Sequence, residues 1–466
     1  MTVLRRFTLC ALGVGVISAG VLGPAASRRT QATAGGTPRP NVLIIVTDDQ
    51  RADTLDVMPA VQKWLRQGGT TYPNAYVSVP LCCPSRATIM TGRYGHNHGV
   101  VDNTAHHSLD QRTTLQYLLG RSGYRTGIVG KYFNGWPMWL DPPFFDRWSI
   151  FRSGYYETKF NVDGKKETIH RYATDYIAKQ SVSVIKSFER KDAKPWLMYV
   201  APSAPHEPFT PAPRHSFAPV PEWDPSPAVG EKDKSDKPPS IRNASGDEAG
   251  GNVIRESQLR SLIAVDEMVA RLMRTLGELK ERERTLVLFM GDNGYFWAEH
   301  GLSDKRLPYT EAIQVPLLAR WPGRLAPGAS DPRLVSLVDV APTVLQAAGV
   351  PPDPFTPQDG RSLLDVWERD RIFVEYFPDQ GAGLIGPWAS IRTPEMQYVE
   401  YYNSFDRVTV EFREYYDLEE DPYQLENLLG DMSPANDPPP TEIQELTIQL
   451  TGDRSCQGTS GPTACP

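Results

Sequence analysis

The chain has 466 residues, of which 40% are hydrophobic and 23% are charged, and its formal net charge is −7. A chain of this length can form one large hydrophobic core, or a large domain with a smaller one. Its acidic balance lacks the excess of lysine and arginine that nucleic-acid binding requires, so we expect no nucleic-acid partner, and an anionic substrate would need positive charge gathered at its binding site.

The first 34 residues have the pattern of a cleavable export signal. Arg5 and Arg6 precede an apolar run over residues 9–22, and small residues follow as far as Ala34. The run is short for a membrane span and rich in glycine and alanine. We therefore expect residues 1–34 to be the signal peptide of a secreted or cell-envelope protein. A retained N-terminal anchor is the alternative, and no later segment predicts a membrane span.

Four continuous apolar runs predict strands that are buried on both faces. They lie at residues 41–47, 126–129, 196–200 and 285–290. A helical pattern over residues 258–279 lies between the last two runs. This alternation of strands and helices predicts an α/β fold with a large, mostly parallel sheet between layers of helices. In such sheets, ligands bind beyond the carboxyl ends of the strands.

The chain changes in character towards its C-terminal end. Residues 211–252 are rich in Pro, Ser, Asp and Lys, which predicts a long surface loop. Beyond residue 370, alternating runs at 372–377, 398–402 and 408–412 predict strands with one solvated face, and a helix is expected near 441–450. We expect the main domain to span residues 35–370. Residues 371–466 are expected to form a small antiparallel subdomain and a tail.

Pairs of polar residues follow the first and the last of the buried runs. Asp48 and Asp49 come directly after one strand, and Asp292 and Asn293 come after the other. Adjacent carboxylates repel each other unless a cation or basic groups neutralise them. Each pair could instead cap a helix or shape a turn. Together, their hard oxygen atoms predict a site for Ca²⁺ or Mg²⁺.

Four cysteines remain once the first 34 residues are set aside, and they do not form a disulfide framework. Export would permit a bond between Cys456 and Cys465. Adjacent Cys82 and Cys83 are not expected to pair with each other, because neighbouring residues seldom reach disulfide geometry. A buried unpaired cysteine is usually a small hydrophobic residue, and a thiolate is a soft ligand that suits an oxygen-rich metal site poorly.

Residues 82–86, Cys-Cys-Pro-Ser-Arg, and their continuation to Arg93 resemble the signature of the type I sulfatases. In that family the first cysteine of the motif is oxidised to formylglycine, and that position is Cys82 here. The resemblance extends from Asn41 to about Leu429, and the chain is most similar to N-acetylglucosamine-6-sulfatases and heparan 6-O-sulfatases. Further segments that carry it are Gly-Lys-Tyr at 130–132, Pro-His-Glu-Pro at 205–208, Asp-Asn-Gly at 292–294, Asp-Lys-Arg at 304–306, Val-Pro-Leu at 315–317, Asp-Val-Ala-Pro-Thr at 339–343 and Tyr-Asp-Leu at 416–418.

The resemblance implies an alkaline-phosphatase-like fold and the hydrolysis of sulfate monoesters of a sugar, such as N-acetylglucosamine 6-sulfate, or of an aryl alcohol. It also implies a formylglycine hydrate as nucleophile on a calcium ion, with magnesium as the alternative, and a formylglycine-generating enzyme as a partner in maturation. The implied metal ligands are Asp48, Asp49, Cys82, Asp292 and Asn293. The implied catalytic residues are Cys82, Arg86, Lys131, His206 and Lys305.

Each implied catalytic residue has a chemical role that suits its type. The planar guanidinium of Arg86 would hold oxygens around the nucleophile and the metal. Lys131 and Lys305 would bind the sulfate oxygens and stabilise the charge that builds on the transferred group. His206 would hydrogen-bond the sulfate or protonate the leaving oxygen.

The sequence departs from many arylsulfatases at one position. Where they carry a histidine two residues after the lysine of the Gly-Lys element, this chain has Phe133, followed by Asn134. This leaves open which group assists the nucleophile, with His98 and His300 as candidates.

Two other functions stay open from the sequence. One is a phosphonate monoester or phosphodiester hydrolase of the same superfamily. The other is an exported protein that binds sulfated glycans without turnover.

Overall fold

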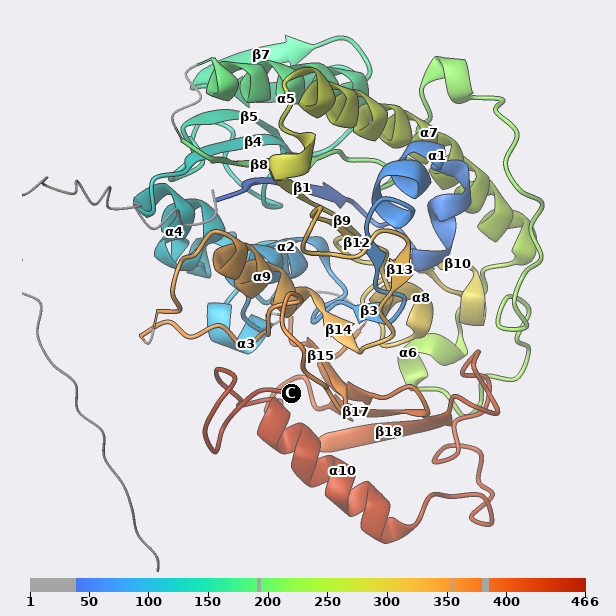
Figure 1. Ribbon diagram of the computed structural model, residues 1–466. Helices are drawn as coiled ribbons and strands as arrows, with labels where there is room; N and C mark the ends of the chain where they lie inside the picture. Colours follow the sequence, from blue (N-terminus) through green and yellow to red (C-terminus); the bar gives the residue numbers. More distant parts are fainter. Residues whose placement is uncertain (1–38, 191–193, 354, 379–384) are drawn as a thin grey trace, which may run out of the picture. The chain divides into compact units, whose positions relative to one another are not determined.

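The computed structural model of this protein describes residues 39–190, 194–353, 355–378 and 385–466 (Figure 1). The predicted signal peptide lies outside these residues. Among the helices that are described, none is long and apolar enough to cross a membrane.

The centre of the main sheet consists of parallel strands, as the buried apolar runs predicted. In the order of pairing they are β9 (Thr285–Gly291), β1 (Asn41–Thr47), β8 (Trp196–Ala201), β4 (Arg125–Lys131) and β5 (Arg147–Phe151). Because these strands run in one direction, their carboxyl ends lie along one edge of the sheet. The prediction of an α/β fold is confirmed.

Antiparallel pairs occur at both margins of the sheet. Beyond β9 lie β12 (Leu317–Arg320), β2 (Thr70–Thr71) and β13 (Ala329–Ser330), and beyond β5 lie β6 (Thr158–Val162) and β7 (Lys165–Ile169). The outermost pair beyond β9, β13 with β2, is parallel. The sheet is therefore parallel at its centre and mixed at its margins. Strand β7 is exposed along most of its length, so it lacks the continuous apolar run that revealed the central strands.

Helices cover both faces of this sheet (Figure 1). On one face lie α5 (Ala173–Glu189) and α7 (Glu248–Glu278), and on the other lie α2 (Cys82–Thr91), α4 (Leu115–Arg121) and α9 (Val340–Ala347). Successive side chains of β1 point to opposite faces: Leu43 and Ile45 join the core with α5 and α7, whereas Val42 and Ile44 join the core with α2, α4 and α9. Burial on both sides is why this strand is apolar throughout.

The predicted loop over residues 211–252 is largely irregular. It contains the short helix α6 (Pro239–Arg242), and α7 begins before the loop was expected to end. The Asp247 side chain caps α7 by accepting a hydrogen bond from the Gly250 amide at 2.8 Å. The helix therefore starts about three turns earlier than the apolar periodicity indicated, because its first turns are mostly exposed.

A separate antiparallel sheet follows residue 370, as predicted. It consists of β15 (Ile372–Tyr376), β16 (Trp388–Arg392), β17 (Met396–Tyr402) and β18 (Val410–Asp417), paired in chain order. Helix α10 (Pro440–Asp453) confirms the C-terminal helix. Strand β16 was not predicted, because all of its residues are buried and its polar Ser390 and Arg392 interrupt any alternation. The domain boundary at residue 370 stays a prediction.

The remaining α-helices and strands are short. They are α1 (Pro59–Val61), α3 (Gly95–His98), α8 (Thr310–Ile313), β3 (Ala75–Tyr76), β10 (Phe296–Trp297), β11 (Ser303–Asp304) and β14 (Val335–Ser336). Strand β10 pairs with β11, and β14 pairs with β3.

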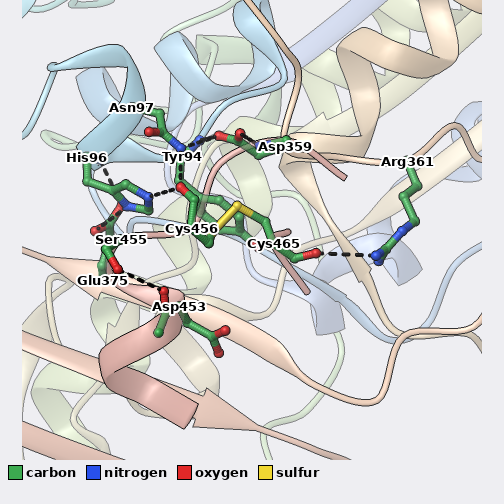
Figure 2. Close-up of a disulfide and its surroundings, with 12 residues drawn as sticks. Tyr94, His96, Asn97, Asp359, Arg361, Glu375, Asp453, Ser455, Cys456 and Cys465 are labelled. Carbon is green, nitrogen blue, oxygen red and sulfur yellow. Dashed lines mark hydrogen bonds and ion pairs between the residues drawn. A yellow bond between two sulfur atoms is a disulfide. The ribbon is translucent and has the colours of Figure 1, made fainter. Parts of the chain in front are cut away.

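The tail after α10 is closed by a disulfide between Cys456 and Cys465, the bond that the sequence left open (Figure 2). The Cys456 carbonyl accepts hydrogen bonds from His96 Nε2 at 3.0 Å and from Asn97 Nδ2 at 2.8 Å. Arg361 donates to the Cys465 carbonyl at 3.3 Å. The tail is thus fastened to α3, which follows the helix that begins at Cys82.

Candidate active site

The acidic pairs predicted from the sequence meet at adjacent strand ends. Strands β1 and β9 are paired in register, Thr47 with Gly291, so Asp48 and Asp292 emerge side by side. The Asp49 amide donates to Asp292 Oδ1 at 3.0 Å, and Asn293 Nδ2 donates to Asp49 Oδ1 at 2.7 Å. All four side chains are buried. The site is therefore positioned by the main sheet.

Helix α2 brings Cys82 and Arg86 to these acids. Cys82 is the first residue of the helix, and its Sγ lies 3.8 Å from Asp49 Oδ1. Arg86 lies one turn later, on the same face. Its Nε donates to Asp292 Oδ2 at 2.8 Å, and its Nη2 lies 3.7 Å from Asp48 Oδ1. The spacing of four residues in the motif thus places a thiol and a guanidinium against one acidic cluster.

Two lysines reach the cluster from different elements. Lys131 ends β4, and its Nζ lies 2.6 Å from Asp48 Oδ2. Lys305 follows β11, and its Nζ lies 2.7 Å and 2.6 Å from the two carboxylate oxygens of Asp49. Gly130, before Lys131, has a φ of 118°, and a Cβ there would lie 2.0 Å from the Ala201 carbonyl oxygen. Only glycine allows β4 to approach β8 this closely.

His206 lies in the loop that follows β8. Its Nε2 is 3.7 Å from Asp49 Oδ2, and its Nδ1 is 2.8 Å from the Glu207 carbonyl oxygen. The Tyr155 hydroxyl donates to the His206 carbonyl at 2.6 Å. The ring is partly exposed, whereas the acids behind it are buried. His206 therefore stands at the entrance of the cluster.

Burial and charge determine the protonation of these groups. Burial alone would raise the pKa of Asp48, but the positive charges of Lys131, His206 and Arg86 together hold this pKa well below its usual range. Burial raises the pKa of Asp292 to about 6, against the opposing effect of Arg86. Burial likewise raises the pKa of the Cys82 thiol well above its usual value. The unmodified thiol is thus protonated and a weak nucleophile.

The side chains present fit a hard divalent cation. The buried atoms Asp48 Oδ1 and Asn293 Oδ1 have no hydrogen-bond partner, although both are strong acceptors. Ligand atoms of Asp48, Asp49, Cys82 and His206 all lie within 4.8 Å of one another. Asp48 and Asp49 supply the carboxylate oxygens of this group, and carboxylate oxygens are donors that Ca²⁺ and Mg²⁺ prefer.

The other histidines considered from the sequence belong to different networks. His98 is buried beneath α2, where its Nε2 lies 3.1 Å from Thr88 Oγ1 and its Nδ1 accepts from the Val100 amide. Burial lowers the pKa of His98 to about 3, so its ring is neutral. The His300 ring packs at a tilt against Tyr309, with a centroid distance of 4.4 Å, and its Nδ1 lies 2.7 Å from Glu231 Oε2. His206 is the histidine that the structure places beside the acids.

Cys83 differs from Cys82 in its surroundings. Its side chain is buried in the hydrophobic core, and burial raises its thiol pKa to about 12. Its amide donates to Asn103 Oδ1 at 3.0 Å.

Sequence reasoning missed Gln258, which lies in the middle of α7. It is buried, and its Nε2 lies 3.5 Å from the Asp49 carbonyl oxygen and 3.4 Å from that of Pro205. Trp297 Nε1 donates to its side-chain oxygen at 2.6 Å. Gln258 thus joins the backbones that carry Asp49 and His206. The one sequence feature that could have indicated Gln258 is its position as a polar residue on the apolar face of a predicted helix.

Comparison with known protein families gives two matches. The family described as "Sulfatase" matches residues 40–350, and "N-sulphoglucosamine sulphohydrolase, C-terminal" matches residues 298–446. The N-acetylglucosamine-6-sulfatase of Homo sapiens is 30% identical to this chain, and the alignment covers 92% of this chain and 86% of that protein. The extracellular sulfatase SULF-1 homolog of Drosophila melanogaster is 33% identical over 73% of this chain, but the chain spans only 32% of its length.

Solved structures share the fold. A protein solved in complex with its substrate D-glucosamine-2-N,6-O-disulfate superposes with a TM-score of 0.73 and 25% identity, covering 89% of this chain and 97% of that one. The phosphonate monoester hydrolase of Agrobacterium radiobacter superposes with a TM-score of 0.70 and 21% identity, covering 89% and 96%.

Proposed function

Because this chain belongs to the sulfatase family and is a sulfuric ester hydrolase, we propose that Cys82 is the precursor of its nucleophile and that calcium is its metal. One observation carries this proposal. The buried Cys82 lies 3.8 Å from Asp49, and Asp49 belongs to a buried cluster of three carboxylates, two lysines and an arginine at the carboxyl edge of the sheet. Formylglycine formed from Cys82 would supply a hydrated aldehyde as the nucleophile.

The cation would be held by Asp48, Asp49, Asp292 and Asn293. Three carboxylates buried together require positive charge nearby. Arg86, Lys131 and Lys305 supply part of it, through the contacts described above. A bound calcium ion would neutralise sulfate oxygens and favour an ionised hydroxyl on the nucleophile.

The basic side chains have distinct tasks in this proposal. Arg86 contacts Asp292 and Asp48 and the Lys131 carbonyl, so its fork fixes the acids relative to β4. Lys131 and Lys305 approach from two sides and would bind the oxygens of the sulfate group. Both are almost completely buried, so water does not screen their charges.

His206 would transfer a proton in this proposal. The Glu207 carbonyl can only accept a hydrogen bond, so Nδ1 carries a hydrogen and Nε2 faces Asp49. A proton on Nε2 would be donated to the oxygen that leaves with the sugar. The partial exposure of the ring suits this role, because the leaving group must reach solvent.

We propose a sulfated sugar as the substrate, with glucosamine 6-sulfate units as its class. The human relative that aligns over 86% of its own length is an N-acetylglucosamine-6-sulfatase, and a structural neighbour was solved with a disulfated glucosamine. An aryl sulfate would be a simpler artificial substrate. We also propose export by residues 1–34, with oxidation of Cys82 by a formylglycine-generating enzyme during maturation.

The test compares Cys82 with its neighbour Cys83. Protein produced together with a formylglycine-generating enzyme is digested, and the peptide containing residues 82–86 is analysed by mass spectrometry. We expect an aldehyde in place of one thiol. Sulfate release from N-acetylglucosamine 6-sulfate should disappear in Cys82→Ala and persist in the matched control Cys83→Ala. Full activity with an unmodified Cys82 would overturn the mechanism, and a higher kcat/KM on an aryl phosphonate than on the matched aryl sulfate would overturn the substrate class.

A further inference from the structure

One cavity of the protein lies far from the candidate active site. It has a volume of about 800 Å³ and is lined by the start of β4 and β5, by α4 and by the end of α5. These are the amino ends of the strands, whereas the acidic cluster follows their carboxyl ends. Strand β4 joins the two places, with Arg125 at one end and Lys131 at the other. At about 3.3 Å for each residue, they are separated by about 20 Å.

The lining of this cavity is basic, although the whole chain is acidic. Arg121, Arg125, Arg190 and Lys194 all line it, and none forms an ion pair with another residue of the described chain. Asp146 is the one acid of the lining, and its carboxylate accepts from the Thr126 amide at 2.8 Å. Among the described lining residues, cations thus outnumber acids at this place, although the net charge of the whole chain is −7.

Aromatic rings accompany the basic side chains. Phe144 is 45% exposed, and its ring centroid lies 4.7 Å from that of Tyr117, which also lines the cavity. Phe144 has a φ of 64°, a left-handed conformation that is costly for a bulky residue. A strained backbone here holds an apolar ring towards solvent, next to the cations. Sugar rings stack on exposed aromatic rings, and guanidinium groups bind sulfate through two parallel hydrogen bonds.

We propose that this cavity is a second binding site, separate from the catalytic one, for a sulfated polysaccharide. The inference rests on the proposed function in one respect: the polysaccharide bound here is the one whose sulfated sugar units the catalytic site would hydrolyse. A monosaccharide cannot bridge two sites on opposite edges of the sheet. The second site would therefore hold the enzyme on the polymer, without taking part in hydrolysis.

The test measures binding without turnover. The full-length Cys82→Ala chain is titrated with a heparin oligosaccharide, and its dissociation constant is compared with that of the same chain carrying Arg121→Ser and Arg190→Ser. Both arginines are exposed, so the fold should survive, and thermal unfolding checks this. The loss of two charge-assisted contacts should weaken binding about tenfold. The matched control carries Lys63→Ser and Arg66→Ser, which remove the same charge from a different surface and should change binding less than about twofold.

Two further measurements, of enzyme kinetics and of DNA binding, identify the class of ligand. They also test this inference independently of the proposed function. In the enzyme with Cys82 intact, Arg121→Ser with Arg190→Ser should raise KM for the oligosaccharide and leave kcat/KM on the monosaccharide unchanged. Equal weakening in the cavity and control variants, or none in either, would overturn the site. An equal loss of affinity for duplex DNA would overturn the assignment to glycans. Absence of sulfate release by the unsubstituted enzyme would refute the proposed function alone, because the binding measurement needs no catalysis.

Discussion

Arg86 Nε lies 2.8 Å from Asp292 Oδ2, although 206 residues separate the two in the chain. Both side chains are completely buried. The contact ties the second turn of α2 to the residue after β9, and so aligns the helix that begins at Cys82 with the acidic residues. A single buried ion pair therefore joins two motifs that lie far apart in the sequence.

Replacing Arg86 with methionine should destabilise the fold as well as abolish activity. It would leave Asp292 and Asp48 buried without their guanidinium, which costs about 3 to 5 kcal/mol of the free energy of unfolding. Urea denaturation measures this difference. Arg66→Met, at an exposed position, is the control and should change stability by less than about 0.5 kcal/mol. Similar values for the two variants would contradict the buried ion pair.

Removal of calcium should lower the stability of the protein. A ligand present at about a hundredfold its Kd stabilises the folded state by about 2.7 kcal/mol. We expect the thermal midpoint to fall on addition of a calcium chelator and to recover with Ca²⁺. In Asn293→Leu, which lacks one oxygen ligand, the response to calcium should shrink. Recovery with Mg²⁺ alone would identify magnesium as the metal.

Replacing Lys305 with methionine should reduce kcat/KM for sulfate monoesters about a hundredfold or more, because a preorganised charge would be lost from the transition state. Sulfate release at several substrate concentrations separates kcat from KM. Lys232→Met, at an exposed position, controls for the loss of charge and should retain activity. An unchanged kcat/KM in Lys305→Met would remove this lysine from the site.

The pair of His96 and Glu375 should make stability depend on pH. Burial lowers the pKa of His96, but the charge and hydrogen bond of Glu375 outweigh this and raise the pKa from 6.5 to about 9. Because the folded-state pKa is the higher one, the stabilisation is complete below about pH 6.5 and is lost as the pH rises through 9.

The loss should amount to about 2 to 3 kcal/mol of the free energy of unfolding. Urea denaturation at pH 6 and pH 10 measures it. Glu375→Gln removes the charge that raises the pKa, so the difference between the two pH values should shrink in this variant. An identical difference in both proteins would exclude His96 as its source.

The disulfide of the tail should contribute to stability. The bond between Cys456 and Cys465 closes a short loop, and a bond of this kind typically contributes about 2 to 4 kcal/mol by restricting the unfolded chain. We expect a serine substitution at both positions to lower the urea midpoint. A reducing agent should destabilise the natural chain by the same amount and should not affect the substituted one.

Much of the fold could be predicted from the sequence because the central strands are marked by local runs of apolar residues. The run from Asn41 to Thr47 is apolar in every position but the ends, and this followed from burial on both faces of β1. Strand β16 and the marginal strand β7 were missed, because one is buried with polar residues and the other is mostly exposed. Gln258 left only a weak signal, since its partners are backbone carbonyls from distant segments.

The sequence by itself determined which chemical groups are available for the proposed site: acidic residues after two strands, a cysteine motif, and lysines in short polar segments. Only the tertiary structure decided which of these groups meet. It placed His206 beside Asp49, and it placed His98 and His300 in other networks. The reason is that the burial of each strand or helix leaves a pattern of apolar and polar residues in the sequence itself. The order in which β9, β1, β8 and β4 pair follows from packing between segments far apart in the chain.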